Sequence, residues 1–193
     1  MTQTKTDPRI LRTRKLIMDS FIELSGKKDF KDITVKDITN AAMINRATFY
    51  YHFEDIYDLL EKVLLEVLLI NLDYHDYENS KLDEETFINL FKAITKFQQS
   101  LSYRCHRSYE ETIARIIREQ LEVIFYKMLV KEHPTIEENV LKGTAVMLSW
   151  GLYGASVEWR RTSKKMTTPE EYIKSVLPFT KNRIGFTSEK ENK

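Results

Sequence analysis

Residues 34–53 constrain what this chain can fold into more tightly than any other segment of its sequence. Thr34 and, three residues later, Asp37 have the spacing of a capping box, which begins a helix. Apolar residues recur at helical spacing up to residue 42, and the pattern then breaks. Asn45 is a good N-cap, so a second helix is expected from Arg46 onward. Because a helix of about two turns is marginal by itself, its outward face is expected to have a function.

Two short helices joined by a tight turn form the helix-turn-helix arrangement, in which the second helix can lie in the DNA major groove. The side chains of the second helix suit that role. Arg46 can bind a guanine through two hydrogen bonds, and Tyr51 can pack on a sugar or a thymine methyl group. The hydroxyls of Thr48 and Tyr50 can reach phosphates. The same residues also suit a solvated helix face, and the spacing alone leaves both interpretations open.

Three motifs in the first third of the chain resemble the TetR family of bacterial transcriptional regulators. They extend over about residues 13–60 and read Thr13-Arg14-x-x-Ile17-x-x-Ser20-Phe21, Ile33-Thr34-Val35-x-x-Ile38 and Ala47-Thr48-Phe49-Tyr50-Tyr51-His52-Phe53. The last motif is the most specific of the three. Farther along, Gly151-Leu152-Tyr153-Gly154-Ala155-Ser156 and the following Trp159-Arg160 resemble the C-terminal domain of a Firmicutes-type branch of the family.

The resemblance implies an all-α protein with two domains. Residues 1–55 would form an N-terminal three-helix, helix-turn-helix DNA-binding domain, and residues 56–193 a C-terminal helical bundle for dimerisation and effector binding. The implied partners are double-stranded operator DNA, a second copy of the chain and a small-molecule effector. The implied function is that of a cytoplasmic transcriptional repressor, which is released from DNA because its effector favours a conformation that cannot bind the operator.

The same resemblance assigns the DNA contacts to the two helices of the motif. The residues that it implicates are Thr34, Lys36, Asn45, Arg46, Ala47, Thr48, Tyr50, Tyr51 and His52. Lys36 is a candidate for a base or a phosphate contact, and the Asn45 amide for a phosphate contact. Phe49 and Phe53 lie in the same segment but are expected in the core.

One position departs from the family pattern. Most members carry a lysine that supports a phosphate contact where this chain has Ile56, and two acidic residues, Glu54 and Asp55, precede it. Arg12 and Arg14 are candidates to replace that contact. The departure also favours an alternative function, a regulator that acts mainly through a protein partner and contacts DNA weakly.

Charge is distributed unevenly although the net charge of the chain is only +1. Residues 9–15 carry Arg9, Arg12, Arg14 and Lys15 with no acidic residue among them. This distribution permits DNA binding through a few directed contacts and does not demand it.

Small residues and aromatic residues mark two candidate surfaces in the second domain. Small side chains allow a second helix to approach closely, and the family places its dimer interface on its last two helices. The interface candidates are Gly143, Gly151, Gly154 and Ala155. Aromatic and methionine side chains at helical spacing are typical of a packed core, but the resemblance implies that some line a ligand pocket. The pocket candidates are Phe91, Phe125, Met147 and Trp150.

Composition argues against several classes of protein. Only 5 glycines and 4 prolines among 193 residues favour helices over β structure with many turns. A single cysteine, Cys105, excludes an internal disulfide. No apolar run approaches the roughly 20 residues of a membrane span, and no signal peptide is expected. His75, His106 and His133 are scattered, so neither a metal nor a cofactor is expected. An enzyme built on a helical bundle is the least favoured alternative, because no catalytic motif is visible.

Capping signals also predict where later helices begin. Asp55 is expected to cap a leucine-rich helix that runs to about Leu72, and Asp83 is expected to cap the next one. The sequence Thr168-Pro169-Glu170-Glu171 combines an N-cap threonine, proline at the first helical position and glutamate at the third. It predicts the start of the final helix.

Overall fold

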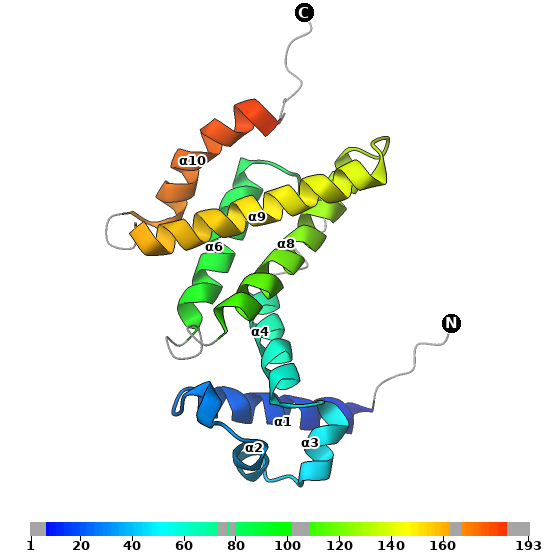
Figure 1. Ribbon diagram of the computed structural model, residues 1–193. Helices are drawn as coiled ribbons and strands as arrows, with labels where there is room; N and C mark the ends of the chain where they lie inside the picture. Colours follow the sequence, from blue (N-terminus) through cyan, green and yellow to red (C-terminus); the bar gives the residue numbers. More distant parts are fainter. Residues whose placement is uncertain (1–6, 73–76, 78–79, 102–108, 163–166, 185–193) are drawn as a thin grey trace, which may run out of the picture. The chain divides into compact units, whose positions relative to one another are not determined.

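The computed structural model describes residues 7–72, 77, 80–101, 109–162 and 167–184. Within those ranges all regular secondary structure is helical, which confirms the all-α prediction (Figure 1). The chain divides into two compact units, Met1–Val67 with Leu101–Ile113, and Leu68–Ser100 with Ala114–Lys193. The expectations for Cys105, His75 and His106 concern residues outside the described ranges.

The first unit contains the predicted pair of short helices. Its elements are α1 (Pro8–Ser25), the 3-10 helix η1 (Phe30–Asp32), α2 (Val35–Ala41), α3 (Arg46–His52), the first turns of α4 (Ile56–Leu72) and the first residues of α8 (Glu110–Glu132). Figure 1 labels the α-helices. Asp7 caps α1, because its carboxylate accepts a hydrogen bond from the backbone nitrogen of Arg9 at 2.9 Å. Pro8 then occupies a first-turn position, where its missing N–H has no helical partner to lose.

A common core holds the elements of the first unit together. The buried large side chains of this core come from α1 to α4 with η1 and the residue after α3, and they are Ile17, Phe21, Phe30, Ile38, Phe49, Phe53, Leu59 and Leu60. The rings of Phe21 and Phe30 meet edge to face, with their centroids 5.8 Å apart. Because α2 and α3 each have only 7 residues, their stability depends on this packing rather than on helix propensity.

The predicted caps of the first unit are confirmed by their hydrogen bonds. The Thr34 hydroxyl accepts from the backbone of Asp37 at 3.2 Å, and the Asp37 carboxylate accepts from the backbone of Thr34 at 2.9 Å. Asn45 caps α3 by accepting from the backbone of Thr48 at 2.7 Å. Asp55 caps α4 by accepting from the backbone nitrogens of residues 57 and 58, each at 2.8 Å. These bonds fix where each helix begins.

The second unit is built around α6 (Glu84–Ser100), which lies against both α9 (Glu138–Thr162) and α10 (Pro169–Ile184) (Figure 1). Asp83 caps α6 as predicted, because its side chain accepts from the backbone of Thr86 at 2.9 Å. Most side chains of α6 are buried, and they include Phe87, Leu90, Phe91, Ile94 and Phe97. Helix α8 (Glu110–Glu132) adds Ile117, Leu121 and Phe125 to the buried set. Among the exposed residues of α6, Glu85, Asn89, Lys92 and Lys96 recur every three or four positions, so α6 keeps one polar stripe and packs its remaining sides into the core.

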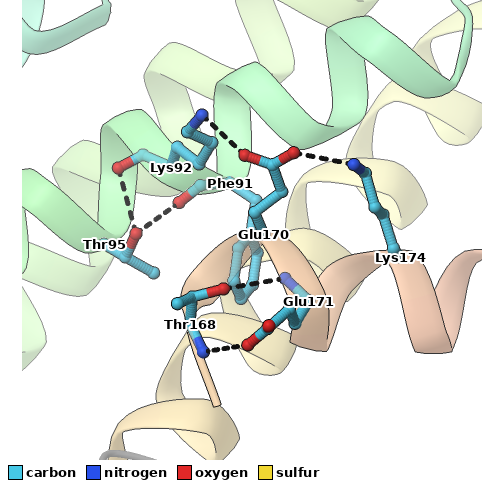
Figure 2. A network of polar contacts seen from close by, with 7 residues as sticks. All are labelled: Phe91, Lys92, Thr95, Thr168, Glu170, Glu171 and Lys174. Carbon is cyan, nitrogen blue, oxygen red and sulfur yellow. Dashed lines mark hydrogen bonds and ion pairs between the residues drawn. The ribbon is translucent and has the colours of Figure 1, made fainter.

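The start of α10 confirms the capping prediction and is tied to α6, as Figure 2 shows. The backbone of Thr168 donates to the Glu171 carboxylate at 2.8 Å, and the backbone of Glu171 donates to the Thr168 hydroxyl at 3.2 Å. Glu170 receives hydrogen bonds from Lys174 at 2.7 Å and from Lys92 of α6 at 2.9 Å. One exposed carboxylate therefore links two helices.

Hydrogen bonds from Lys174 and then Lys92 lower the pKa of Glu170 from 4.5 to about 2. The unfolded chain binds this proton more tightly, so the contribution of Glu170 to stability is present above pH 4.5 and is lost as the pH falls toward about 2. We expect Glu170→Gln to lower the melting temperature at neutral pH. The difference from the wild type should shrink as the pH falls through that window.

Thermal unfolding followed by circular dichroism at a series of pH values measures this difference. The matched control is Glu66→Gln, which removes an exposed carboxylate of α4. A deficit of Glu170→Gln that stays constant with pH would contradict the assigned role of the ion pairs.

Candidate nucleic-acid interface

Helix α3 separates its side chains into a buried face and an exposed face. Phe49 is fully buried and Phe53, one turn later, is 2% exposed, so this edge of the segment faces the core as predicted. Arg46, Tyr50 and Tyr51 are exposed, and the exposed fraction of Tyr51 reaches 70%. Burial of the phenylalanines therefore fixes the rotation of α3 about its axis and turns the other residues outward.

Arg46 and Tyr50 lie one turn apart on the exposed face and interact. An Nη2 of Arg46 donates to the Tyr50 hydroxyl oxygen at 3.4 Å. The guanidinium carries five N–H donors, so this single long hydrogen bond leaves most of its donor capacity unused. The pair therefore offers a cation and a hydroxyl side by side on one surface. Ala47 is exposed beside them and adds little bulk.

Asn45 and Thr48 use much of their hydrogen-bonding capacity within the helix. The Asn45 side-chain oxygen accepts from the backbone nitrogen of Thr48 at 2.7 Å and from its hydroxyl at 2.9 Å. A carboxamide oxygen has two lone pairs, so this oxygen is committed to the start of α3. Only the Asn45 amide nitrogen remains suited to donate outward.

Thr34 is similarly committed to the start of α2. Its hydroxyl donates to the Asp37 carboxylate at 2.8 Å, in addition to the capping hydrogen bond described above. Hydrogen bonds from the Thr34 hydroxyl and backbone, and then from Lys28, lower the pKa of Asp37 to about 2. Asp37 is therefore a full anion at neutral pH. Lys36, the next candidate in this helix, is exposed.

His52 lies at the end of α3 and is held by Arg14 of α1. Arg14 donates from Nη1 to the His52 backbone carbonyl at 3.2 Å, and its guanidinium carbon lies 4.5 Å from the centre of the Phe53 ring. Burial and, secondly, the charge of Arg14 lower the pKa of His52. His52 is thus neutral at pH 7 and can offer a hydrogen bond, but no positive charge, to a phosphate. Arg14 itself positions α3.

The turn between α2 and α3 contains a feature that the sequence did not indicate. Met43 has a backbone φ of 51°. Among the residues other than glycine in the part of the chain that the structure describes, only Met43 has a positive φ. Its side chain is 91% exposed. A left-handed conformation costs an L-residue roughly 1–2 kcal/mol. The turn of the motif is therefore strained, and nothing in a Met-Ile-Asn sequence signals it.

The region around Ile56 is acidic, and the basic residues lie elsewhere. Ile56 is the first residue of α4 and is half-buried, with Glu54 and Asp55 exposed before it. On α1, Arg9 and Arg12 are exposed, as is Lys15. These side chains, rather than Arg14, are available to contact a polyanion.

Helix α9 carries the proposed dimer residues on an exposed face. A Cβ added at Gly143, Gly151 or Gly154 would meet no heavy atom within 4 Å among the described residues, so these glycines face open space within one chain. Ala155 is half-buried. Large apolar side chains of α9 are exposed along the same helix, namely Val140, Val146, Met147 and Trp150. The Arg118 guanidinium of α8 lies 4.0 Å from the centre of the Trp150 ring.

The four pocket candidates do not come together in the structure. Phe91 and Phe125 are fully buried, and the Phe125 ring packs on Phe87 with centroids 5.3 Å apart. Met147 is 71% exposed and Trp150 is 55% exposed. Their side chains therefore cannot line one interior cavity with the two phenylalanines in a single chain. The sequence pattern missed this because an aromatic residue on a helix is compatible with both faces.

Two other site types have no representative among the residues that the structure describes. No three histidine, cysteine, aspartate or glutamate side chains there are grouped so as to hold a metal ion. No helix in the same ranges is both long and apolar enough to cross a bilayer.

Comparison with known proteins finds a family match within the first unit. The family model described as bacterial regulatory proteins of the tetR family matches residues 17–63, which include α2, the turn and α3. YxbF, an uncharacterized HTH-type transcriptional regulator of Bacillus subtilis (strain 168), is 36% identical over 63 residues, 32% of this chain and 17% of that protein. DhaS of Lactococcus lactis subsp. lactis (strain IL1403), an HTH-type dhaKLM operon transcriptional activator, is 34% identical over 74 residues, 36% of this chain and 40% of that protein. The chain thus matches less than half the length of either relative.

Solved structures resemble the chain over most of its length. A TetR-family transcriptional regulator from Pectobacterium atrosepticum has a TM-score of 0.59 at 14% identity, covering 92% of this chain and 97% of that one. The TetR family repressor AlkX from Dietzia sp. has a TM-score of 0.52 at 17% identity, covering 88% and 95%. At these identities the likeness concerns the fold alone. It confirms an N-terminal helix-turn-helix domain followed by a helical C-terminal domain.

The strain at Met43 leads to a prediction about stability. Met43→Gly should stabilise the chain by about 1 kcal/mol, because glycine adopts positive φ without steric cost and the methionine side chain buries little. Denaturation by urea, followed by circular dichroism, measures the change. Met43→Ala shortens the side chain but keeps the strain, so it should give no such gain. Equal stabilisation by both substitutions would show that the backbone is not the cause.

Proposed function

We propose that this chain, which belongs to the TetR family of bacterial regulatory proteins, is a sequence-specific DNA-binding transcriptional regulator that acts in the cytoplasm. The observation that carries the proposal is the outward face of α3. Because Phe49 and Phe53 are buried, Arg46, Tyr50 and Tyr51 lie together on a surface that the described part of the chain leaves exposed. A short, exposed second helix of a helix-turn-helix is the element that enters the major groove.

The exposed side chains divide into base-reading and backbone-binding groups. We assign base recognition to Arg46, whose fork of donors matches the acceptors of guanine, and to Tyr51, whose ring can cover a thymine methyl group. Lys36 can reach either a base or a phosphate. We assign phosphate contacts or the positioning of the helix to the remaining candidates, Thr34, Asn45, Ala47, Thr48, Tyr50 and His52. Contacts to phosphates fix the register of the protein on the duplex.

We further propose that the protein works as a homodimer through α9. Its exposed stripe of Val140, Met147 and Trp150 runs beside glycines that leave room for a facing helix. A dimer supplies two recognition helices for two half-sites one helical turn apart. The resemblance of Gly151–Ser156 to a Firmicutes-type C-terminal domain remains a prediction.

Two modes of regulation are candidates. The first is a repressor that a small-molecule effector releases, by binding the DNA-incompetent conformation more tightly. AlkX, similar in fold, is a repressor. The second is a regulator that acts mainly through a protein partner and contacts DNA weakly. DhaS, similar over 74 residues, is an activator, and the acidic start of α4 disfavours phosphate binding.

Binding of the full-length chain to the duplex upstream of its own gene tests the proposal. Fluorescence anisotropy at physiological salt should give an affinity at least about 1,000-fold above that for a shuffled duplex, as specific recognition requires. Equal affinity for both duplexes would remove sequence-specific recognition and leave the partner-dependent candidate. A transcription assay in vitro with the same duplex then distinguishes repression from activation.

The two roles assigned within α3 predict different mutational effects. Arg46→Ala should reduce discrimination at one base pair by roughly 1–3 kcal/mol. Tyr50→Phe removes only a hydroxyl, so it should weaken binding to all duplexes equally, by about 1 kcal/mol. Affinities measured for a set of duplexes with single base changes separate these patterns. A uniform loss for Arg46→Ala would show that Arg46 contacts a phosphate.

The open space around Gly154 predicts a contrast between two substitutions. Gly154→Ala adds one methyl group, whereas Gly154→Leu should overpack a facing helix and split the dimer. Within a single chain a Cβ at Gly154 meets no heavy atom within 4 Å among the described residues. On an open surface, alanine would therefore stabilise α9 by about 1 kcal/mol. Light scattering gives the mass, and thermal unfolding the stability. A Gly154→Leu variant that remains dimeric and melts higher would place this glycine outside the interface.

A further inference from the structure

We propose that Met43 is a further DNA-contacting residue, whose side chain covers an apolar surface of the duplex, either a thymine methyl group or a deoxyribose. Met43 lies in the turn that joins α2 to α3 (Figure 1). The proposal rests on the proposed function, because it adds a contact to the same interface. Its basis is a strained turn whose strain no packing within the described chain offsets.

The way in which α2 ends requires a left-handed residue at position 43. The backbone nitrogen of Met43 donates to the Asn40 carbonyl at 3.2 Å. The next backbone nitrogen, that of Ile44, donates to the Thr39 carbonyl at 3.0 Å. These two hydrogen bonds form a Schellman motif, in which the first residue beyond the helix end has a positive φ and is usually glycine. The motif therefore gives a methionine the φ of 51° that a glycine adopts without steric cost.

Packing within the chain does not offset the strain at Met43. The side chain is 91% exposed, the largest exposed fraction among the large apolar side chains that the structure describes. A side chain this exposed removes too little apolar surface from water to stabilise the fold. Strained residues of this kind gather at sites of binding, where the strain serves a function. The contact that offsets the strain therefore lies outside the chain.

The surroundings of Met43 favour DNA as the partner. Residues 38–53 include Arg46 and contain no aspartate or glutamate, so this segment presents no acidic side chain to a polyanion. Asn40 before the turn is exposed, as are Asn45 and Arg46 after it. Three residues span at most about 11 Å, which is less than the roughly 12 Å width of the major groove. With Arg46 in the groove, Met43 lies over the groove or at its rim.

The chemistry of the methionine side chain selects apolar parts of the duplex. A thioether carries no charge and is only a weak hydrogen-bond acceptor, so it gains little from a phosphate. Its flexible and polarizable chain adapts to irregular apolar surfaces. The major groove offers such a surface at the C5-methyl group of thymine, and the backbone offers one at the sugar. A methyl contact would make Met43 a determinant of specificity, whereas a sugar contact would add affinity alone.

Substitutions at Met43 in the full-length chain test the contact, with fluorescence anisotropy on the duplex upstream of its own gene. Met43→Ala and Met43→Gly should each weaken binding about tenfold per half-site, the loss expected when about half of a buried methionine side chain is removed. Met43→Gly relieves the strain and Met43→Ala keeps it, so equal losses of affinity separate the DNA contact from folding. Met43→Leu restores apolar bulk and should recover most of the affinity.

The matched control is Ile70→Ala, which removes an apolar side chain of α4 that is 72% exposed, and it should bind DNA as the wild type does. Wild-type affinity of both Met43→Ala and Met43→Gly would overturn the contact and leave the proposed function standing. A Met43→Leu chain as weak as Met43→Ala would likewise contradict an apolar contact. A wild type that does not prefer this duplex to a shuffled one would overturn the proposed function and this contact together.

Deoxyuridine, which lacks the C5-methyl group, distinguishes the two apolar surfaces when it replaces each thymine of the duplex in turn. A methyl contact predicts that the wild type loses affinity at one thymine of each half-site and that Met43→Ala is insensitive to the same change. A sugar contact predicts no such position for Met43, and an equal loss for Met43→Ala on every duplex.

Discussion

Burial of Phe49 is the interaction on which the rest of the first unit depends. A helix of 7 residues cannot persist in water through its own hydrogen bonds. With the Phe49 side chain fully buried, and Phe53 and Phe21 nearly so, α3 is held at one rotation about its axis. That rotation decides which side chains can meet a partner. The outward face of α3, which we propose as the recognition surface, is therefore a consequence of core packing.

Hydrogen bonds at the helix ends determine which polar side chains can still bind a partner. Thr34 and Asn45 are occupied at the starts of α2 and α3, and Arg14 holds the last carbonyl of α3. A group that already has its partners gains little from a new one, since the net value of a hydrogen bond is about 1 kcal/mol. We therefore propose that recognition of bases falls to Arg46 and Tyr51, whose side chains make few contacts within the described chain.

Local signals made the helix-turn-helix and the helix starts predictable. Caps depend on side chains within three residues, so Thr34 with Asp37, Asn45 and Thr168 with Glu171 could be recognised from the sequence. The core role of Phe49 followed from the same short segment.

Features that depend on distant residues could not be predicted. The role of Arg14 requires knowing that α1 passes the end of α3, 38 positions later. The exposure of Met147 and Trp150 depends on which face of α9 meets α6, and the helical spacing of the residues does not determine that face. The strained turn at Met43 and the contribution of Tyr109 to the first unit likewise arise only from tertiary packing.

Selection from a random duplex library tests most directly whether the α3 surface reads DNA sequence. The full-length chain is incubated with the library at physiological salt, and the bound duplexes are amplified and sequenced. A dimeric reader should enrich a two-fold symmetric sequence with half-sites one helical turn apart, and an Arg46→Ala chain should lose the preference at one position in each half-site. Enrichment of no sequence over the starting library, with the chain folded and dimeric, would contradict the account.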